Sequence, residues 1–150
     1  MKKYTPINGW TKEKIKQQLL LKNNGTRSAD GPTCLYITED NNRCAVGCFI
    51  PDSLIECFRG VELAAHDLYD EGEVDEHTGM QTSEWLTLMD SLPLKKRALE
   101  ELQSVHDSSG KYYKGNKLDK ASLTNPNLCS ENVHVRMLAW VDQFVEDTNE

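Results

Sequence analysis

The sequence predicts a mostly helical α+β protein, in which about five helices pack around a small β-hairpin at residues 33–50. Three observations support this fold class. Residues 33–38 are rich in β-branched and aromatic side chains, which favours a strand. The next four residues, 39–42, include one Asp and two Asn, which favour a turn because they tolerate a positive φ. Much of the remaining chain carries apolar residues at helical spacing. A length of 150 residues indicates a single domain, 1–150.

The second half of the predicted hairpin fits two types of element. Residues 43–50 form a short apolar run, which suits either a return strand or a short helix beginning near Cys44. Pro51 ends either element, because proline lacks a backbone N–H and has a fixed φ.

Caps and apolar periodicity predict the helices. Thr11 is a suitable N-cap for a helix over 12–22, in which Ile15 and Leu19 share one face. The clearest amphipathic helix starts at Pro93 and ends at His106 and Asp107. Further helices are predicted over 54–58, over 61–69, after Ser83 and after Ser130. We expect the acidic segment 67–76 to be an exposed loop.

The charge distribution excludes some partners. The net charge is −7, and residues 52–91 contain eleven acidic residues and a single arginine. Nucleic-acid binding needs a basic face that releases counterions, so we expect no nucleic-acid partner; the acidic middle fits a basic protein partner. No apolar run approaches 18 residues and the N-terminus lacks an apolar core, so we expect neither a membrane span nor a signal peptide, and a cytoplasmic location.

The five cysteines are expected to be free thiols, because their number is odd and the cytoplasm is reducing. Cys44 and Cys48 have a spacing that fits half of a zinc knuckle, but no second pair follows. We therefore expect core packing and no metal, with a zinc-stabilised structural module as an alternative. No phosphate-binding loop or dinucleotide fingerprint is present, so no cofactor is expected.

A catalytic alternative uses Cys44, His106 and Asp107. Arg43 and a helix N-terminus near Cys44 would both lower the pKa of its thiol and favour the nucleophilic thiolate. His106 would then supply the base and Asp107 its orienting group. This set predicts a cysteine-dependent hydrolase or transferase.

A non-catalytic alternative places a small polar pocket at the centre of the molecule or between two copies of the chain. A tight turn would bring Tyr36, Cys44 and Gly47 together, and Gly47 would allow a ligand or another backbone to approach closely. His106 would close this pocket from the end of its helix. The expected ligand-binding residues are Tyr36, Arg43, Gly47 and His106, with Asp107 beside them.

Three sequence blocks carry a resemblance to known proteins. They are Cys34-x-Tyr36, the run from Arg43 to Asp52 (RCAVGCFIPD), and Leu102 to Asp107 (LQSVHD). Together they resemble a group of small uncharacterised proteins of tailed phages and bacteria that share C-x-Y, C-A-V-G-x-L-I-P-D and L-Q-x-x-H-D. Phe49 stands where those proteins usually have leucine. The resemblance spans residues 10–107, and neither the acidic insert nor 111–150 matches.

The resemblance implies a phage or prophage setting, and hence the cytoplasm of a bacterial host, but no established activity. We therefore expect an accessory protein, such as an anti-defence or host-takeover factor, that binds a host protein or a small signalling molecule. A protein-binding role would use the acidic segment 67–76 or the loop with Tyr112 and Tyr113.

Overall fold

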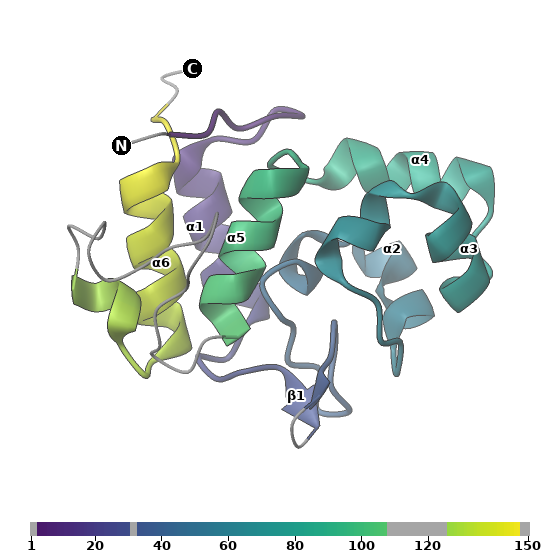
Figure 1. The fold of residues 1–150 in the computed structure, drawn as a ribbon, viewed down its shortest axis with the longest axis horizontal. Helices are drawn as coiled ribbons and strands as arrows, with labels where there is room; N and C mark the ends of the chain where they lie inside the picture. The colour runs from purple at the N-terminus through teal and green to yellow at the C-terminus, as the bar shows by residue number, and fades with distance from the viewer. Residues whose placement is uncertain (1–2, 31–32, 108–125, 148–150) are drawn as a thin grey trace.

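The computed structural model is mostly helical and describes residues 3–30, 33–107 and 126–147. Two groups of helices make up the molecule (Figure 1), and a parallel β-bridge joins Tyr4, near one end of the chain, to Val145, near the other. The α-helices in the described part are α1 (Lys12–Lys22), α2 (Asp52–Ile55), α3 (Glu71–Thr78), α4 (Thr82–Ser91), α5 (Lys96–Asp107) and α6 (Val133–Phe144). Short 3-10 helices are η1 (Gly47–Phe49), η2 (Glu56–Phe58), η3 (Ala65–Tyr69) and η5 (Pro126–Cys129).

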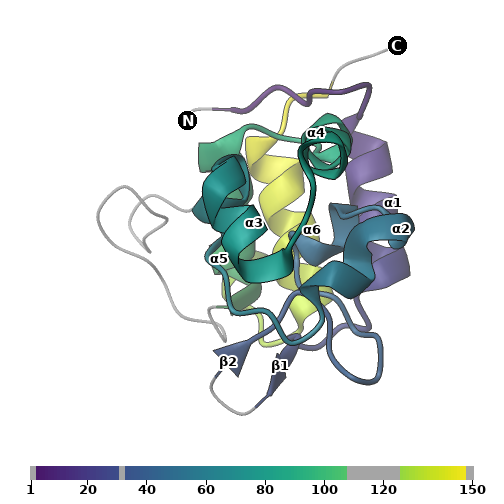
Figure 2. The ribbon, with the colours of Figure 1, turned by 90° about the vertical axis from the view of Figure 1, so that its right-hand side faces the viewer.

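The predicted α+β fold with a hairpin at 33–50 is wrong. The strands in the described part are β1 (Ala29–Asp30) and β2 (Thr33–Cys34), antiparallel two-residue segments at the edge of the molecule (Figure 2). Within 33–50, further pairing in the described part is a single isolated bridge between Ile37 and Arg43. Residues 43–50 do not return as a strand. Instead, the Cys48 N–H donates to the Cys44 carbonyl at 3.0 Å and the chain continues into η1. Every residue of 42–50 is buried, so packing on all sides favours a compact turn over a strand.

Helices α1, α5 and α6 form the larger group. Helix α6 contacts both α1 and α5. The predicted start of α1 is confirmed, because the Thr11 hydroxyl accepts a hydrogen bond from the Lys14 N–H. Ile15 and Leu19 point into the core from α1, and Trp140 does so from α6. The N-terminal segment lies beside the end of α6, where the Tyr4 N–H donates to the Phe144 carbonyl at 2.7 Å.

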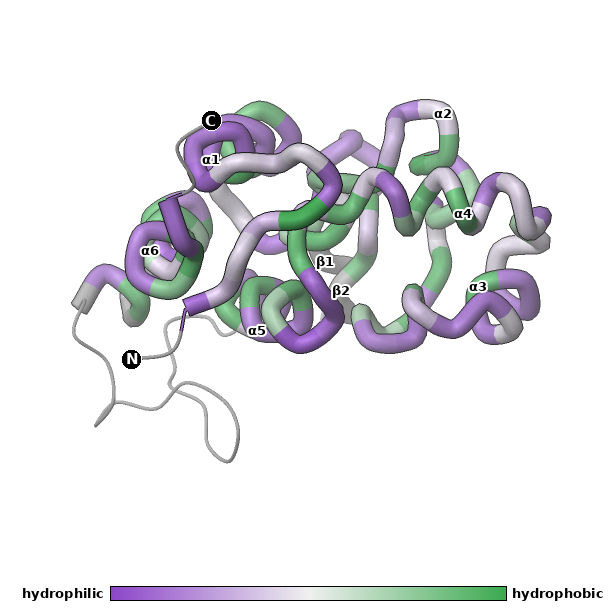
Figure 3. The backbone as a smooth tube through the Cα atoms, turned by 90° about the horizontal axis from the view of Figure 1, so that it is seen from above, coloured by the Kyte–Doolittle hydropathy of each residue, from purple (hydrophilic) through white to green (hydrophobic). Residues whose placement is uncertain are grey.

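Helix α3 replaces most of the loop that was expected at 67–76. Asp70 caps it by accepting from the N–H groups of Gly72 and Glu73. Acidic residues in the first turn are favoured there by the helix dipole. Val74 is buried and anchors the helix, which lies at one end of the molecule and is largely hydrophilic in Figure 3. Ordinary cap chemistry therefore explains why this acidic segment is helical.

Other boundaries also differ from the predictions. Residues 61–64 are not helical, so the helix expected over 61–69 is reduced to η3. Gln81 caps α4 with Glu84 in a capping box, and Asn132 rather than Ser130 caps α6. The loop with Tyr112 and Tyr113 lies outside the described residues. No helix in the described ranges has the length and apolar character needed to cross a bilayer.

Candidate functional site

A groove lies between α5 and the segment that leads into η3. It consists of two adjoining pockets of about 390 Å³ and 260 Å³, which share Ala64, Ala65, Gln103 and Asp107. We call it the α5 groove. The larger pocket is also lined by Tyr36 and Cys44. The predicted residues Tyr36, Cys44 and Asp107 therefore line one pocket, whereas Arg43, Gly47 and His106 do not.

Asp107 joins the two pockets from the C-terminal end of α5. Its Oδ1 lies 2.7 Å from His106 Nδ1 and 3.0 Å from Gln103 Nε2. The other carboxylate oxygen, Oδ2, has no hydrogen-bond partner among the described residues, and the side chain is 37% exposed. The dipole of α5 disfavours a carboxylate at this end. Asp107 is thus an anionic group held in place by its neighbours, with one oxygen available to a ligand.

His106 orients Asp107 and has no free nitrogen for catalysis. The side chain is fully buried, and Nε2 accepts a hydrogen bond from the Ser28 backbone N–H at 3.0 Å. Because a backbone N–H can only donate, Nε2 carries no proton and the ring hydrogen is on Nδ1. Nδ1 therefore donates to Asp107. The lone pair that a general base would use is already occupied.

Cys44 lies at the base of the larger pocket and is 2% exposed. Its Sγ accepts a hydrogen bond from the Gly47 N–H at 3.2 Å. Burial raises the pKa of the Cys44 thiol well above its ordinary value, which is the opposite of what a nucleophilic thiolate needs. The expected activation by Arg43 also fails, because the Arg43 guanidinium binds Asp52 and the carbonyl of Ile50.

Alkylation tests this environment directly. We expect iodoacetamide at pH 7.4 to modify Cys44 at least about tenfold more slowly than Cys57, because Cys44 is buried and Cys57 is partly exposed. Peptide mass spectrometry over time measures both rates in one sample. Faster modification of Cys44, lost in a His106→Ala variant that still melts cooperatively, would support the catalytic hypothesis.

Cys44 and Cys48 have the spacing of half a zinc knuckle, and their surroundings are those of core residues. Both thiols are buried in the core, and burial raises the pKa of Cys48 to about 12. Neither belongs to a group of three close metal-ligating side chains there. The side chain of Cys34 lies outside the described set. These two cysteines act as small core residues.

Arg43 stabilises the turn that follows it and does not contact the groove. Its Nη2 lies 2.7 Å from Asp52 Oδ1, and its Nη1 donates to the carbonyls of Ile50 at 3.1 Å and Gly47 at 3.4 Å. The Arg43 guanidinium, helped by Lys22, holds the pKa of Asp52 below its usual value. The arginine thus ties together both ends of the segment 43–52.

Tyr36 lines the larger pocket, and Gly47 packs closely against the Tyr36 carbonyl group. The Tyr36 hydroxyl donates to the Leu63 carbonyl at 2.6 Å, and burial raises its pKa. A Cβ on Gly47 would lie 2.2 Å from the Tyr36 carbonyl oxygen. The close approach that was predicted at Gly47 is therefore confirmed, and the approaching group is the protein's own backbone.

Sequence reasoning missed the polar side of α5. Gln103 connects two segments: its Oε1 accepts from the Val46 N–H at 3.0 Å and its Nε2 donates to Asp107. Glu100 lines the smaller pocket, and Glu62 lines the larger one from the opposite wall. The signal was present in the spacing, because Glu100, Gln103 and Asp107 recur at i, i+3 and i+7.

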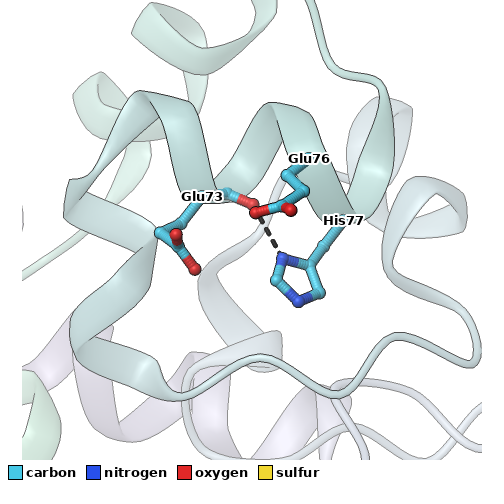
Figure 4. Close-up of side chains that lie close together, drawn as sticks. All are labelled: Glu73, Glu76 and His77. Atoms are coloured by element: carbon cyan, nitrogen blue, oxygen red, sulfur yellow. Dashed lines mark hydrogen bonds between the residues drawn. The ribbon is translucent and has the colours of Figure 1, made fainter.

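A second group of potential ligands lies on α3 (Figure 4). One ligand atom from each of Glu73, Glu76 and His77 lies within 4.8 Å of the other two, and His77 Nδ1 lies 2.9 Å from the Glu73 carbonyl oxygen. All three side chains are on one helix, and Glu76 and His77 are exposed. A solvated surface cluster of this kind needs no ligand, so we assign it no role.

Comparison with known proteins adds no relative. No family model matches the chain, and neither curated proteins nor solved structures show significant similarity. The chemistry of the α5 groove is therefore what points to a function.

Proposed function

We propose that this protein acts by binding, and that the α5 groove receives a cationic group from a host protein or a small molecule. This role fits a phage-type accessory protein of the anti-defence or host-takeover kind, acting in the bacterial cytoplasm. The observation that carries the proposal is Asp107, an anionic side chain held at the junction of two pockets with Oδ2 available.

The charges around Asp107 support a cationic ligand. Four carboxylates line the two pockets, against the single guanidinium of Arg97 and the imidazole of His66. Arg97 is itself close to Glu101, at 3.9 Å. A cation entering the groove would meet a surplus of negative charge in a partly enclosed space, where electrostatic attraction is stronger than in bulk water. An anionic ligand would be repelled.

The environments of Cys44 and His106 support binding without catalysis. The Cys44 thiol is buried and resists ionisation, and the Nε2 lone pair of His106 is occupied by Ser28. Cys44 lines the larger pocket, and His106 orients Asp107. The cysteine-dependent hydrolase or transferase remains the alternative, and the alkylation experiment above separates the two.

A matched pair of probes tests the proposal. We expect arginine amide to bind at least about fivefold more tightly than citrulline amide, its neutral near-isostere, because an ion pair in a partly buried site contributes about 1 kcal/mol or more. Two-dimensional NMR titration, following the backbone signals of Gln103 and Asp107, measures both affinities. Equal affinities for the two amides would contradict the proposal.

Two variants locate the effect. Asp107→Asn removes the charge and keeps an oxygen that can accept a hydrogen bond from His106. The ratio of the affinities for arginine amide and citrulline amide should therefore fall to about one. Asp75→Asn removes an exposed charge on α3, outside the two pockets, and should leave the preference unchanged. Loss of the preference in both variants would indicate a general charge effect instead of a site.

A further inference from the structure

The segment Val61–Ala65 has the side-chain pattern of a β-strand but no partner strand. Val61, Leu63 and Ala65 are half-buried and pack against the core, whereas Glu62 and Ala64 are exposed. This alternation has the period of two that characterises an extended chain with one face on the core. Residues 61–64 are neither helical nor part of a turn, and Ala64 has φ −66° and ψ 148°.

The backbone of this segment offers unused hydrogen-bonding groups. Among the described residues, the N–H groups of residues 62–65 and the carbonyls of Val61 and Glu62 have no protein partner. The segment is nevertheless anchored: the Val61 N–H donates to Phe58, the Leu63 carbonyl accepts from Tyr36, and the Ala64 carbonyl accepts from Asp67. It therefore resembles the open edge of a sheet, with a row of groups that can template another strand.

This open edge borders the α5 groove. Leu63 lines the larger pocket, and Ala64 and Ala65 line both. Glu62 on the segment and Asp107 across the groove supply negative charge on both sides. A chain laid along the edge would direct alternate side chains, about 7 Å apart, toward the groove.

We propose that Val61–Ala65 binds an extended, basic segment of a partner protein by β-strand addition, with lysine or arginine side chains entering the α5 groove. This inference rests on the proposed cation-binding function and specifies the ligand as a basic protein segment. Main-chain pairing would supply affinity, and the acidic groove would select basic side chains. The lysine-rich segment 12–22 of a second copy is a poor candidate, because it is already helical and two of its lysines, Lys16 and Lys22, bind Asp142 and Asp52.

The probe is a pool of acetylated and amidated heptapeptides with arginine fixed at the centre, compared with a pool that has glutamate there. Because successive N–H groups of an extended chain point to opposite edges, and the Leu63 side faces Tyr36, the amides of Glu62 and Ala64 form the open edge. We expect the arginine pool to bind, and its best member, resynthesised singly, to slow hydrogen exchange at these two amides at least about tenfold. N-methylation of alternate backbone nitrogens keeps the charge of that peptide but removes its pairing donors. It should weaken binding at least about tenfold.

A proline variant provides the sharpest control. Ala64 already has a φ that proline adopts, and its N–H has no partner among the described residues, so Ala64→Pro should leave the melting temperature nearly unchanged. It removes one donor from the edge. We expect at least about a fivefold loss of affinity for the peptide.

The outcomes separate the two proposals. If the peptide binds through its charge, while the amides of Glu62 and Ala64 exchange freely and neither N-methylation nor Ala64→Pro matters, strand addition is wrong and cation binding stands. If the arginine and glutamate pools bind equally and arginine amide shows no preference over citrulline amide, both proposals fail.

Discussion

Replacing Gly47 with alanine is expected to lower the free energy of unfolding by about 3 kcal/mol, as for severe overpacking of a core. The new Cβ would lie 2.2 Å from the Tyr36 carbonyl oxygen, which is backbone and cannot rotate away. That oxygen also accepts a hydrogen bond from the Cys44 N–H at 3.2 Å, so moving it would break the contact between two buried segments. Urea unfolding followed by circular dichroism measures the change.

The same substitution at Gly72 is the matched control. Gly72 lies within α3, and the atom nearest to a Cβ added there is the Asp70 Oδ1 at 3.3 Å, on a side chain that can adjust. Alanine is favoured over glycine in a helix by up to about 1 kcal/mol, so Gly72→Ala should be neutral or stabilising. Similar destabilisation by both variants would show that close packing at Gly47 is not the cause.

Replacing Arg136 with methionine should also cost about 3 kcal/mol, because it leaves buried carbonyl groups without donors. Arg136 is fully buried on α6. Its guanidinium donates to the carbonyls of Val105 at 2.9 Å, His106 at 2.8 Å and Ser130 at 2.6 Å. A cation at the C-terminal end of α5 also complements the dipole of that helix. Thermal and urea unfolding measure the loss, and methionine keeps much of the side-chain volume.

Arg97→Met is the control for Arg136→Met. Arg97 is on the exposed side of α5, 57% exposed, and lies 3.9 Å from Glu101. Exposed ion pairs contribute roughly 0–1 kcal/mol, so this variant should unfold close to the wild type. If Arg136→Met were equally harmless, the buried guanidinium would not be what holds the end of α5, and the position of Asp107 would need another explanation.

Both expected effects bear on the α5 groove. Gly47 lets the Tyr36 segment pack against the turn that carries Cys44, which forms the floor of the larger pocket. Arg136 secures the last turn of α5, whose final residue is Asp107. The core contacts that stabilise the fold therefore also place the groove residues.

Local sequence signals were enough to predict some of the helices. Thr11 predicted the start of α1 through its side-chain oxygen, and the apolar spacing after Pro93 predicted the amphipathic helix α5, which begins at Lys96 and not at Pro93. These predictions succeed because capping and amphipathic spacing act within a few residues along the chain. The sequence also suggested Tyr36, Cys44 and Asp107 as candidate site residues, and these three side chains line one pocket.

Packing between distant segments decided the rest. The apolar run at 43–50 carries no period that separates strand from helix, and its burial on all sides made it a turn followed by η1. Arg43 precedes Cys44 in the chain, yet its guanidinium forms an ion pair with Asp52 and does not act on the Cys44 thiol. The protonation of Cys44 and the occupied Nε2 of His106 depend on burial and on Ser28, a residue distant in the sequence. Local chemistry along the chain thus set where helices could begin and end, whereas long-range contacts decided which polar groups stay available in the groove.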